Sequence, residues 1–334
     1  MRVGIDLGGT KIVAVALDGS VEVARALVDT PRDDYEGTLD AIIGVVTALE
    51  QRIPHAACPP KLEERGPESR FPSVGVGIPG TISPSTGRVK NANSTWLIGQ
   101  PLLQDLESRL GRRVRIANDA NCFAMSEAAD GAGKGANVVF GVIAGTGAGA
   151  GIVVRRHLLT GPNAIAGEWG HNSLPWARED ETPGPACYCG KHGCIETFLS
   201  GPAMTADHAR RTGLRLSPPE IVSRAAAGES RAEETMARYE ERMARALASV
   251  INVLDPDVIV LGGGMSNIER LYENVPRLWG AYVFACGTSL HGSSRDPQGL
   301  APLEKDPVRT RFVRARHGDS SGVRGAAWLW PAAP

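Results

Sequence analysis

The chain has 334 residues, of which 42% are hydrophobic and 22% are charged, and its formal net charge at pH 7 is -1. This charge balance gives no basis for binding nucleic acid or an anionic membrane, and no apolar run reaches membrane-spanning length. A chain of this length predicts two domains, each with its own core. An N-terminus without a basic and then apolar leader, together with six cysteines, favours the reducing cytoplasm.

The first pattern is a strand, a tight turn and a second strand within residues 2–17. The turn, residues 6–11, reads Asp-Leu-Gly-Gly-Thr-Lys. Paired glycines bring backbone N–H groups close to an anion, Thr10 adds a hydroxyl donor, and Asp6 can hold a hydrated magnesium ion. The Walker spacing is absent, so phosphate binding and a plain turn both stay open for this hairpin.

The next segment alternates helices, loops and one strand. Apolar residues at helical spacing predict helices over residues 35–52 and 101–110, and residues 74–80 predict a buried strand that ends in a turn. Residues 54–72 break every periodicity and predict an exposed loop.

A short apolar strand, residues 114–117, delivers the pair Asn118-Asp119 to the start of a helix expected over residues 120–130. Strand ends are where α/β folds place reacting groups, so Asp119 could accept the proton of a substrate hydroxyl. A carboxylate at this position could equally cap the helix, and both roles stay open.

The hairpin design returns at residues 138–154, around a glycine-rich turn at 144–151. A dinucleotide fingerprint must open a helix, whereas residues 152–154 continue as a strand, so we reject a nicotinamide site. Two such hairpins indicate an internal duplication with two phosphate loops.

Residues 167–171, Gly-Glu-Trp-Gly-His, and residues 187–196 form the segment around which we expect the site to be organised. They offer one imidazole and three thiolates, the ligand set of a closed tetrahedral zinc site. Buried structural thiols are an alternative, and a redox dithiol is disfavoured because the spacing is C-x-C and not C-x-x-C. The loop turns back at Gly190 and Gly193. The predicted ligands are His171, Cys187, Cys189 and Cys194.

Beyond this loop, residues 218–228 and 231–254 predict helices, and residues 256–261 predict a buried strand that runs into glycines 262–264. That glycine turn could lie close against an adenosine, or it could be a plain connection from a strand to a helix, and both interpretations stay open. Residues 289–305 predict an exposed insertion, and residues 314–330 predict a final packing helix.

Taken in order, the motifs at residues 6–11, 118–121, 145–149, 167–171 and 187–196 resemble those of the ROK family of bacterial sugar kinases and repressors. Residues 30–35, 90–96 and 317–322 are similar to the fructokinases of that family that also accept mannose. The similarity covers almost the whole chain. It thins near residues 54–73 and 285–308, where we expect insertions.

The resemblance implies an α/β fold of the actin/hexokinase-like (ribonuclease H-like) class, duplicated into two domains with a cleft between them. A hinge near Ala117 would separate a small domain, residues 1–117 plus about 312–334, from a large domain, residues 118–311, that carries the zinc loop.

The resemblance also implies roles for single residues. Asp119 would be the general base. The sugar would be bound by Gly80, Asn93, Asn118, Glu168, His171 and Glu196. ATP and Mg²⁺ would be held by Asp6, Gly8, Gly9, Thr10, Lys11, Thr146 and Gly147, with Gly262, Gly263 and Gly264 beside the adenosine. Structural Zn²⁺ would be held by the four predicted ligands, and His171 would reach a sugar hydroxyl through its second ring nitrogen.

We therefore expect magnesium-dependent transfer of the ATP γ-phosphate to the primary hydroxyl of a hexose, with fructose favoured and mannose also accepted. Glucokinase and N-acetylmannosamine kinase activities are the near alternatives. A sugar-responsive regulator is disfavoured, because no helix-turn-helix precedes the hairpin that starts at Arg2. A sugar sensor without catalysis is a further alternative, and the subunit count is open, with a homodimer as one option.

Overall fold

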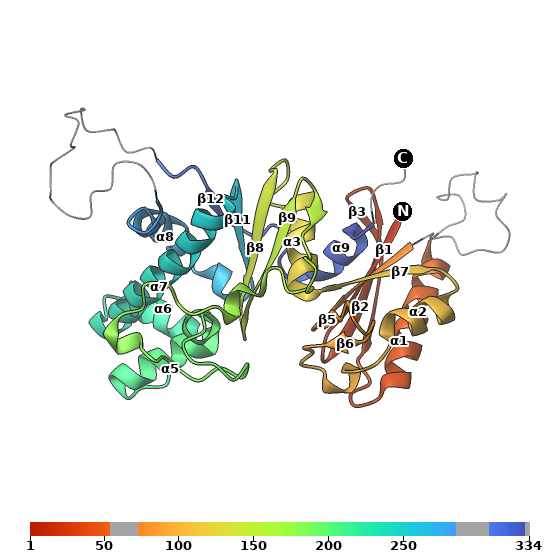
Figure 1. Ribbon diagram of the computed structural model, residues 1–334, viewed down its shortest axis with the longest axis horizontal. Coiled ribbons are helices and arrows are strands. Elements are labelled where there is room, and N and C mark those ends of the chain that lie inside the picture. Colours follow the sequence, from red (N-terminus) through yellow and green to blue (C-terminus); the bar gives the residue numbers. More distant parts are fainter. Residues whose placement is uncertain (54–72, 285–306, 331–334) are drawn as a thin grey trace. The chain divides into compact units, whose positions relative to one another are not determined.

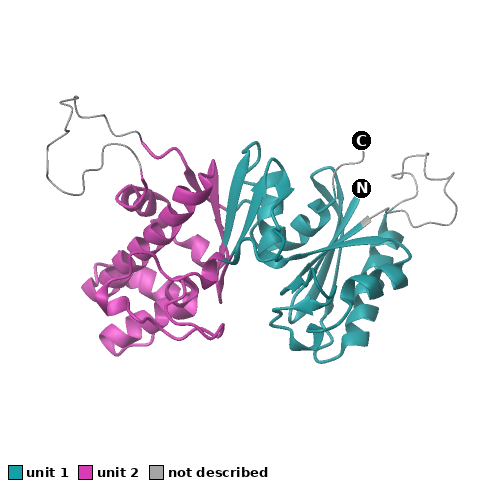
Figure 2. Ribbon diagram, viewed as in Figure 1, with its two compact units in different colours: residues 1–142, 150–168, 315–334 teal, residues 143–149, 169–314 magenta. Residues whose placement is uncertain are grey.

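The computed structural model describes residues 1–53, 73–284 and 307–330 (Figure 1). The loops expected at residues 54–72 and 289–305 lie outside the described residues. Two compact units make up the chain (Figure 2). Unit 1 comprises Met1–Val142, Ala150–Glu168 and Ala315–Pro334, and unit 2 comprises Ile143–Gly149 and Trp169–Arg314. The domain boundaries expected from the sequence, at residue 117 and near residue 312, stay a prediction.

Unit 1 is built on a five-stranded sheet in the order β3-β2-β1-β4-β7. Its antiparallel meander consists of β1 (Arg2–Leu7), β2 (Lys11–Asp18) and β3 (Val21–Asp29). Two parallel strands, β4 (Ser73–Ile78) and β7 (Arg113–Asn118), extend the sheet beyond β1. Because β1, β4 and β7 run the same way, Asp6 and Asn118 lie at the same carboxyl edge.

The α-helices in the described part of unit 1 are α1 (Tyr35–Arg52), α2 (Leu102–Leu110), α3 (Asp119–Ala129) and α9 (Ser321–Trp328). The side chain of Asp34 caps α1 by accepting from Gly37 N at 2.9 Å. Glycines let α9 pack closely in this unit. A Cβ on Gly75 would lie 1.8 Å from Ala326 O, and one on Gly325 would lie 1.6 Å from Cys122 O, so both positions require glycine.

A second five-stranded sheet has the order β10-β9-β8-β11-β12. Its strands are β8 (Val138–Ala144), β9 (Ala148–Val154), β10 (His157–Leu158), β11 (Val258–Gly262) and β12 (Arg311–Arg314). A small two-stranded sheet pairs β5 (Thr81–Ile82) with β6 (Val89–Lys90). Both predicted strand-turn-strand hairpins, β1-β2 and β8-β9, are thus present.

The helices of unit 2 are α4 (Glu196–Leu199), α5 (Gly201–Thr212), α6 (Pro218–Ala226), α7 (Ser230–Leu254) and α8 (Leu271–Trp279). The predicted helices at residues 218–228 and 231–254 are confirmed. The predicted final helix was too long, because residues 311–314 form β12 and the helix begins only at Ser321, after a 3-10 turn at Gly318–Ser320.

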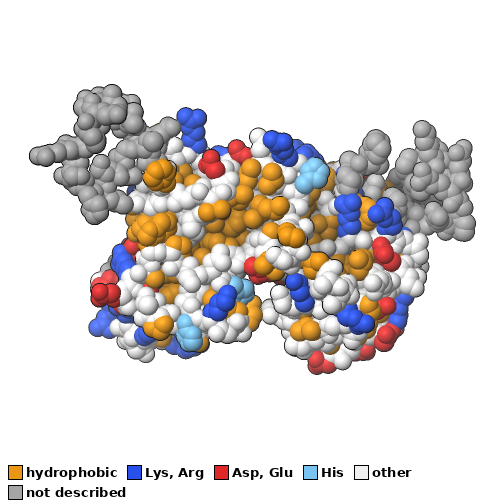
Figure 3. Space-filling view, viewed as in Figure 1, with side chains coloured by type: hydrophobic (Ala, Val, Ile, Leu, Met, Phe, Trp, Pro, Cys, Tyr) orange, Lys and Arg blue, Asp and Glu red, His pale blue; other side chains and the backbone are white. Residues whose placement is uncertain are grey.

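The surface carries charges of both signs. Lys and Arg side chains are interspersed with Asp and Glu on the face drawn in Figure 3. Within residues 1–53, 73–284 and 307–330, no helix combines the length and the apolar content that a bilayer crossing requires.

Candidate active site and metal centre

The carboxyl edge of the unit 1 sheet brings two carboxylates, Asp6 and Asp119, into electrostatic contact. Burial, with a smaller contribution from the charge of Asp119, raises the pKa of Asp6 to about 6. Asp119 reaches solvent, yet the protein packed around its carboxylate desolvates it and raises its pKa. Two carboxylates that burial makes easier to protonate, one of them also affected by the charge of the other, are suited to a site that receives a cation or a proton.

The side chains of Asn118 and Asp119 both accept a hydrogen bond at the start of α3. Asn118 is the N-cap residue, and its Oδ1 accepts from Ala120 N at 2.9 Å. Oδ1 of Asp119 accepts from the same N–H at 2.7 Å. Because Asn118 already caps the helix, Asp119 is not needed as the cap, and its exposed side chain can meet another partner.

The first glycine hairpin is held in shape by the segment that follows β3. Thr30 donates from Oγ1 to Gly8 O at 2.8 Å, and Thr30 N donates to Thr10 O at 3.0 Å. Gly9, Thr10 and Lys11 are exposed, so the turn offers open backbone N–H groups. The hairpin therefore has the form expected of an anion-binding turn.

Three further predicted sugar contacts belong to unit 1. Gly80 has a φ of 126°, and a Cβ there would lie 2.7 Å from Lys90 O, so only glycine fits. Asn93 and Glu168 are exposed side chains. Glu168 opens a 3-10 turn, Glu168–His171, that joins it directly to the predicted metal ligand.

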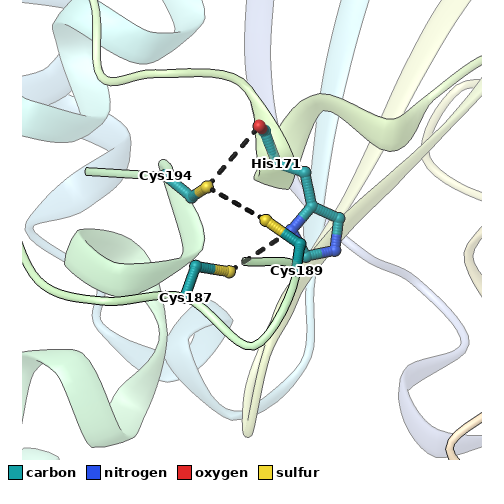
Figure 4. Close-up of side chains that lie close together, drawn as sticks. All are labelled: His171, Cys187, Cys189 and Cys194. Carbon is teal, nitrogen blue, oxygen red and sulfur yellow. Dashed lines mark hydrogen bonds between the residues drawn. The ribbon is translucent and has the colours of Figure 1, made fainter. Parts of the chain in front are cut away.

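The four predicted metal ligands converge in unit 2 (Figure 4), and their ligand atoms all lie within 4.8 Å of one another. Cys187 Sγ lies 3.6 Å from His171 Nδ1, and Cys189 Sγ lies 3.6 Å from Cys194 Sγ. Zn–S bonds of about 2.3 Å give a tetrahedron with S–S edges of about 3.8 Å. The cluster therefore has the donor set and spacing that fit zinc.

Glycine geometry explains how a short loop supplies three thiolates. Gly190 and Gly193 adopt positive φ values of 86° and 67°, as their place in the sequence predicted. Gly190 N donates to Cys187 O at 3.0 Å, which closes the turn that carries Cys189.

The second nitrogen of His171 has a partner that the sequence reasoning missed. Nε2 of His171 lies 3.0 Å from the hydroxyl of Tyr188, whose ring packs edge-on against the imidazole at 5.1 Å. The sugar contact expected through this nitrogen stays a prediction, since in the structure the Tyr188 hydroxyl lies at that position. In the sequence, the one feature that could have indicated this contact is the position of the tyrosine between Cys187 and Cys189.

Glu196 and the second glycine turn are in contact. Oε2 of Glu196 accepts from Ala148 N at 2.9 Å, and a Cβ on Gly147 would lie 2.5 Å from the same oxygen. Gly147 must therefore lack a side chain for the turn carrying Thr146 to approach Glu196.

A cavity of about 780 Å³ in unit 2 lies beside the second and third glycine turns. It is lined by two predicted nucleotide residues, Thr146 and Gly264. Gly263, with φ 77°, packs on β8, where a Cβ would lie 2.4 Å from Ala144 O. The remaining lining, which sequence patterns missed, includes Pro202, Thr205, Arg215, Ser217, Pro218, Pro219 and Asn267.

The predicted site residues thus fall into two groups. Unit 1 holds Asp6, Gly8, Gly9, Thr10, Lys11, Gly80, Asn93, Asn118, Asp119 and Glu168. Unit 2 holds Thr146, Gly147, His171, Cys187, Cys189, Cys194, Glu196, Gly262, Gly263 and Gly264.

The chain belongs to the ROK family, whose model matches residues 2–333. It is 38% identical over 334 residues to an N-acetyl-D-glucosamine kinase of Photobacterium profundum, covering 98% of this chain and 99% of that protein. A ROK hexokinase from Thermus thermophilus shares its fold with a TM-score of 0.77 and 28% identity, covering 98% of this chain and 97% of that one.

A ROK glucokinase from Streptomyces griseus, solved in complex with glucose and AMPPNP, shows a TM-score of 0.69 and 26% identity, with 98% of each chain covered. These likenesses confirm the predicted actin/hexokinase-like, two-domain fold.

Proposed function

We propose that this protein is an ATP-dependent sugar kinase that transfers the γ-phosphate to the primary hydroxyl of a hexose, with N-acetyl-D-glucosamine as the preferred substrate. The near full-length, 38% identical relative named as an N-acetyl-D-glucosamine kinase supports the choice of sugar. It favours this amino sugar over the fructose expected from the sequence motifs.

The observation that carries the proposal is the carboxylate pair at the edge of the unit 1 sheet. Asp119 has a raised pKa and reaches solvent, as a base that accepts a hydroxyl proton requires. Asp6 lies near the end of β1, which leads into the glycine turn, and there it would hold the magnesium ion of MgATP. Asn118, Gly80, Asn93, Glu168 and His171 would position the sugar.

The nucleotide would occupy the cavity of unit 2. Backbone N–H groups around Thr146 and Gly147 suit phosphates, and the part of the cavity lined by Gly264 and the prolines suits an adenosine. Arg215, which also lines this cavity, supplies a positive charge for the anionic nucleotide.

Zinc would be held by His171, Cys187, Cys189 and Cys194 in a structural role, with no open coordination position. When bound, it would fix the orientation of the His171 ring. Glu196, which follows the ligand Cys194 by two residues, would be held in place as well, and it accepts a hydrogen bond from Ala148 N.

The experiment that tests this function is a steady-state assay of ATP consumption with N-acetyl-D-glucosamine, N-acetylmannosamine, glucose, mannose and fructose. The highest kcat/KM is expected for N-acetyl-D-glucosamine. A preference for fructose would restore the expectation from sequence, whereas no sugar-dependent ATP consumption would favour a sensor and overturn the kinase proposal.

A further inference from the structure

Unit 1 contains a cavity of about 530 Å³ that the proposed kinase reaction does not use. Every residue that lines it belongs to the segments drawn in teal in Figure 2. Its walls come from α2, β7, α3, the β9-β10 turn, β10 and the end of α9, and none of the predicted sugar, nucleotide or metal residues lines it.

The walls of the cavity are mostly apolar. Met125, Leu158, Trp328 and Leu329 are among the side chains that face it. Nε1 of Trp328 is buried and has no hydrogen-bond partner among the described residues. The buried indole nitrogen is not accessible from the cavity, so the Trp328 ring contributes an apolar surface there, and such a cavity suits a flat apolar body.

Basic side chains stand at the same cavity. Arg115 lines it and lies 4.2 Å from the centre of the Trp330 ring, with its Nη1 donating to Leu329 O at 2.5 Å. Arg156 also lines it, and in the part of the chain that the structure describes its guanidinium forms no ion pair. These positive charges would complement an anion.

A second guanidinium, that of Arg2, lies within electrostatic range of Arg156. Burial lowers the pKa of the Arg2 guanidinium, and the charge of Arg156 lowers it further, so the two cations act on each other. Asp130 also acts on Arg2, but its carboxylate is bonded to His317 at 2.8 Å and to Arg324. An exogenous anion would relieve this repulsion.

The backbone holds Arg156 in an unusual conformation. Arg155 and Arg156 have φ values of 48° and 66°, and they form the tight turn between β9 and β10. Asparagine or glycine normally occupies such positions, because a side chain with Cβ is disfavoured there. Two consecutive arginines in this turn are costly, and only Arg156 faces the cavity.

We propose that this cavity binds a small molecule with a flat apolar or aromatic body and one anionic group. The apolar body would lie against Leu158 and Trp328, and the anionic group would be bound by Arg156 and Arg115. The inference does not depend on the proposed sugar kinase activity.

The test uses two fluorescent probes that differ in charge. 8-Anilinonaphthalene-1-sulfonate carries an aromatic body with an anionic group, and N-phenyl-1-naphthylamine has the same body without the charge. Both are titrated into the full-length protein, once alone and once with excess ADP.

Arg156→Asn removes the charge and tolerates the positive φ, and Arg155→Asn is the matched control, one residue away in the same turn. We expect Arg156→Asn to weaken binding of the sulfonate about fivefold or more while leaving the neutral probe unchanged, because one charge-assisted contact is lost. Arg155→Asn should leave the affinity for both probes near that of the native chain.

Leu158→Trp fills the cavity without changing charge and should abolish binding of both probes, while circular dichroism confirms the fold. The proposal is overturned if the sulfonate binds Arg156→Asn as it binds the native chain, if both asparagine variants weaken it equally, or if a folded Leu158→Trp protein still binds both probes.

Discussion

Glu196, two residues after the last predicted metal ligand, accepts a hydrogen bond from Ala148 N at 2.9 Å. On the other side of the same residue, a Cβ on Gly170 would lie 1.8 Å from Ala148 O. The 3-10 turn that carries His171 and the loop that carries Cys194 therefore both pack on Ala148. The metal loop and the second glycine turn are one connected structure within unit 2.

This contact predicts that Glu196→Ala raises the KM for ATP as well as the KM for the sugar. Loss of a carboxylate acceptor leaves the Ala148 N–H unpaired and frees the turn at Thr146, so we expect about a tenfold increase in the KM for ATP. Glu196→Gln keeps one oxygen acceptor and should have a smaller effect. A change confined to the KM for the sugar would limit Glu196 to sugar binding.

Asp119→Asn should lower kcat by about a hundredfold to ten-thousandfold, because the amide cannot accept the hydroxyl proton. Asparagine can still accept from Ala120 N, so the start of α3 should be unchanged and the sugar Kd should stay within about threefold. Kinetics and calorimetric sugar titration measure the two quantities. Near-native turnover would remove Asp119 from the role of base.

The raised pKa of Asp6 predicts a magnesium-dependent pH profile. At limiting Mg²⁺, kcat/KM for ATP should fall below about pH 6 as Asp6 is protonated, and excess Mg²⁺ should move the midpoint lower because metal and proton compete for one carboxylate. A midpoint independent of Mg²⁺ would contradict this assignment.

The same shift affects stability. The folded protein holds the Asp6 proton more tightly than the unfolded chain does. The ionisation of Asp6 therefore lowers the stability of the metal-free protein as pH rises from 3.8 to about 6. Asp6→Asn should remove this contribution, and urea unfolding of both proteins at pH 4 and pH 7 measures it.

A buried ion-pair cluster should stabilise the segment that leads into the metal loop. Arg245 donates to both carboxylate oxygens of Glu181 at 2.8 Å and to Trp176 O at 2.6 Å, with 1% of its side chain exposed and 3% of that of Glu181. Arg245→Met should lower the free energy of unfolding by about 3–5 kcal/mol, because Glu181 loses one of its buried partners.

A matched surface control is available in the same unit. Arg211 pairs with Asp180, with side chains 42% and 51% exposed, so Arg211→Ala should cost less than about 1 kcal/mol in the free energy of unfolding. Urea titration compares the two variants. Equal losses in the free energy of unfolding would show that the buried cluster around Glu181 stabilises the protein no more than a surface ion pair does.

Local chemistry made much of this structure predictable. The C-x-C-x4-C spacing after a histidine predicted the four-residue cluster because ligand type and glycine turns are properties of short segments. Periodicity predicted α1 and α7 for the same reason. The final helix was predicted to start too early, at Arg314, because that residue pairs with Leu261 of β11, a partner far away in the sequence, and a 3-10 turn precedes Ser321.

Other features depend on contacts that sequence spacing does not encode. The hydroxyl of Tyr188 at His171 Nε2, the prolines of the unit 2 cavity and the cavity beside Arg156 all arise from residues distant in the chain. The preferred hexose is equally hard to predict from sequence spacing, because it depends on which side chains contact the hydroxyl groups of the sugar. The motifs therefore predicted the ROK family, whereas the choice of sugar stays a proposal.

The most direct test is analysis of the product formed from ATP and N-acetyl-D-glucosamine by phosphorus NMR, with the native chain and with Asp119→Asn. The account predicts a single phosphomonoester at the primary hydroxyl with the native chain, and essentially none with the variant. Phosphate released without a sugar ester, or an equal yield from the variant, would contradict it.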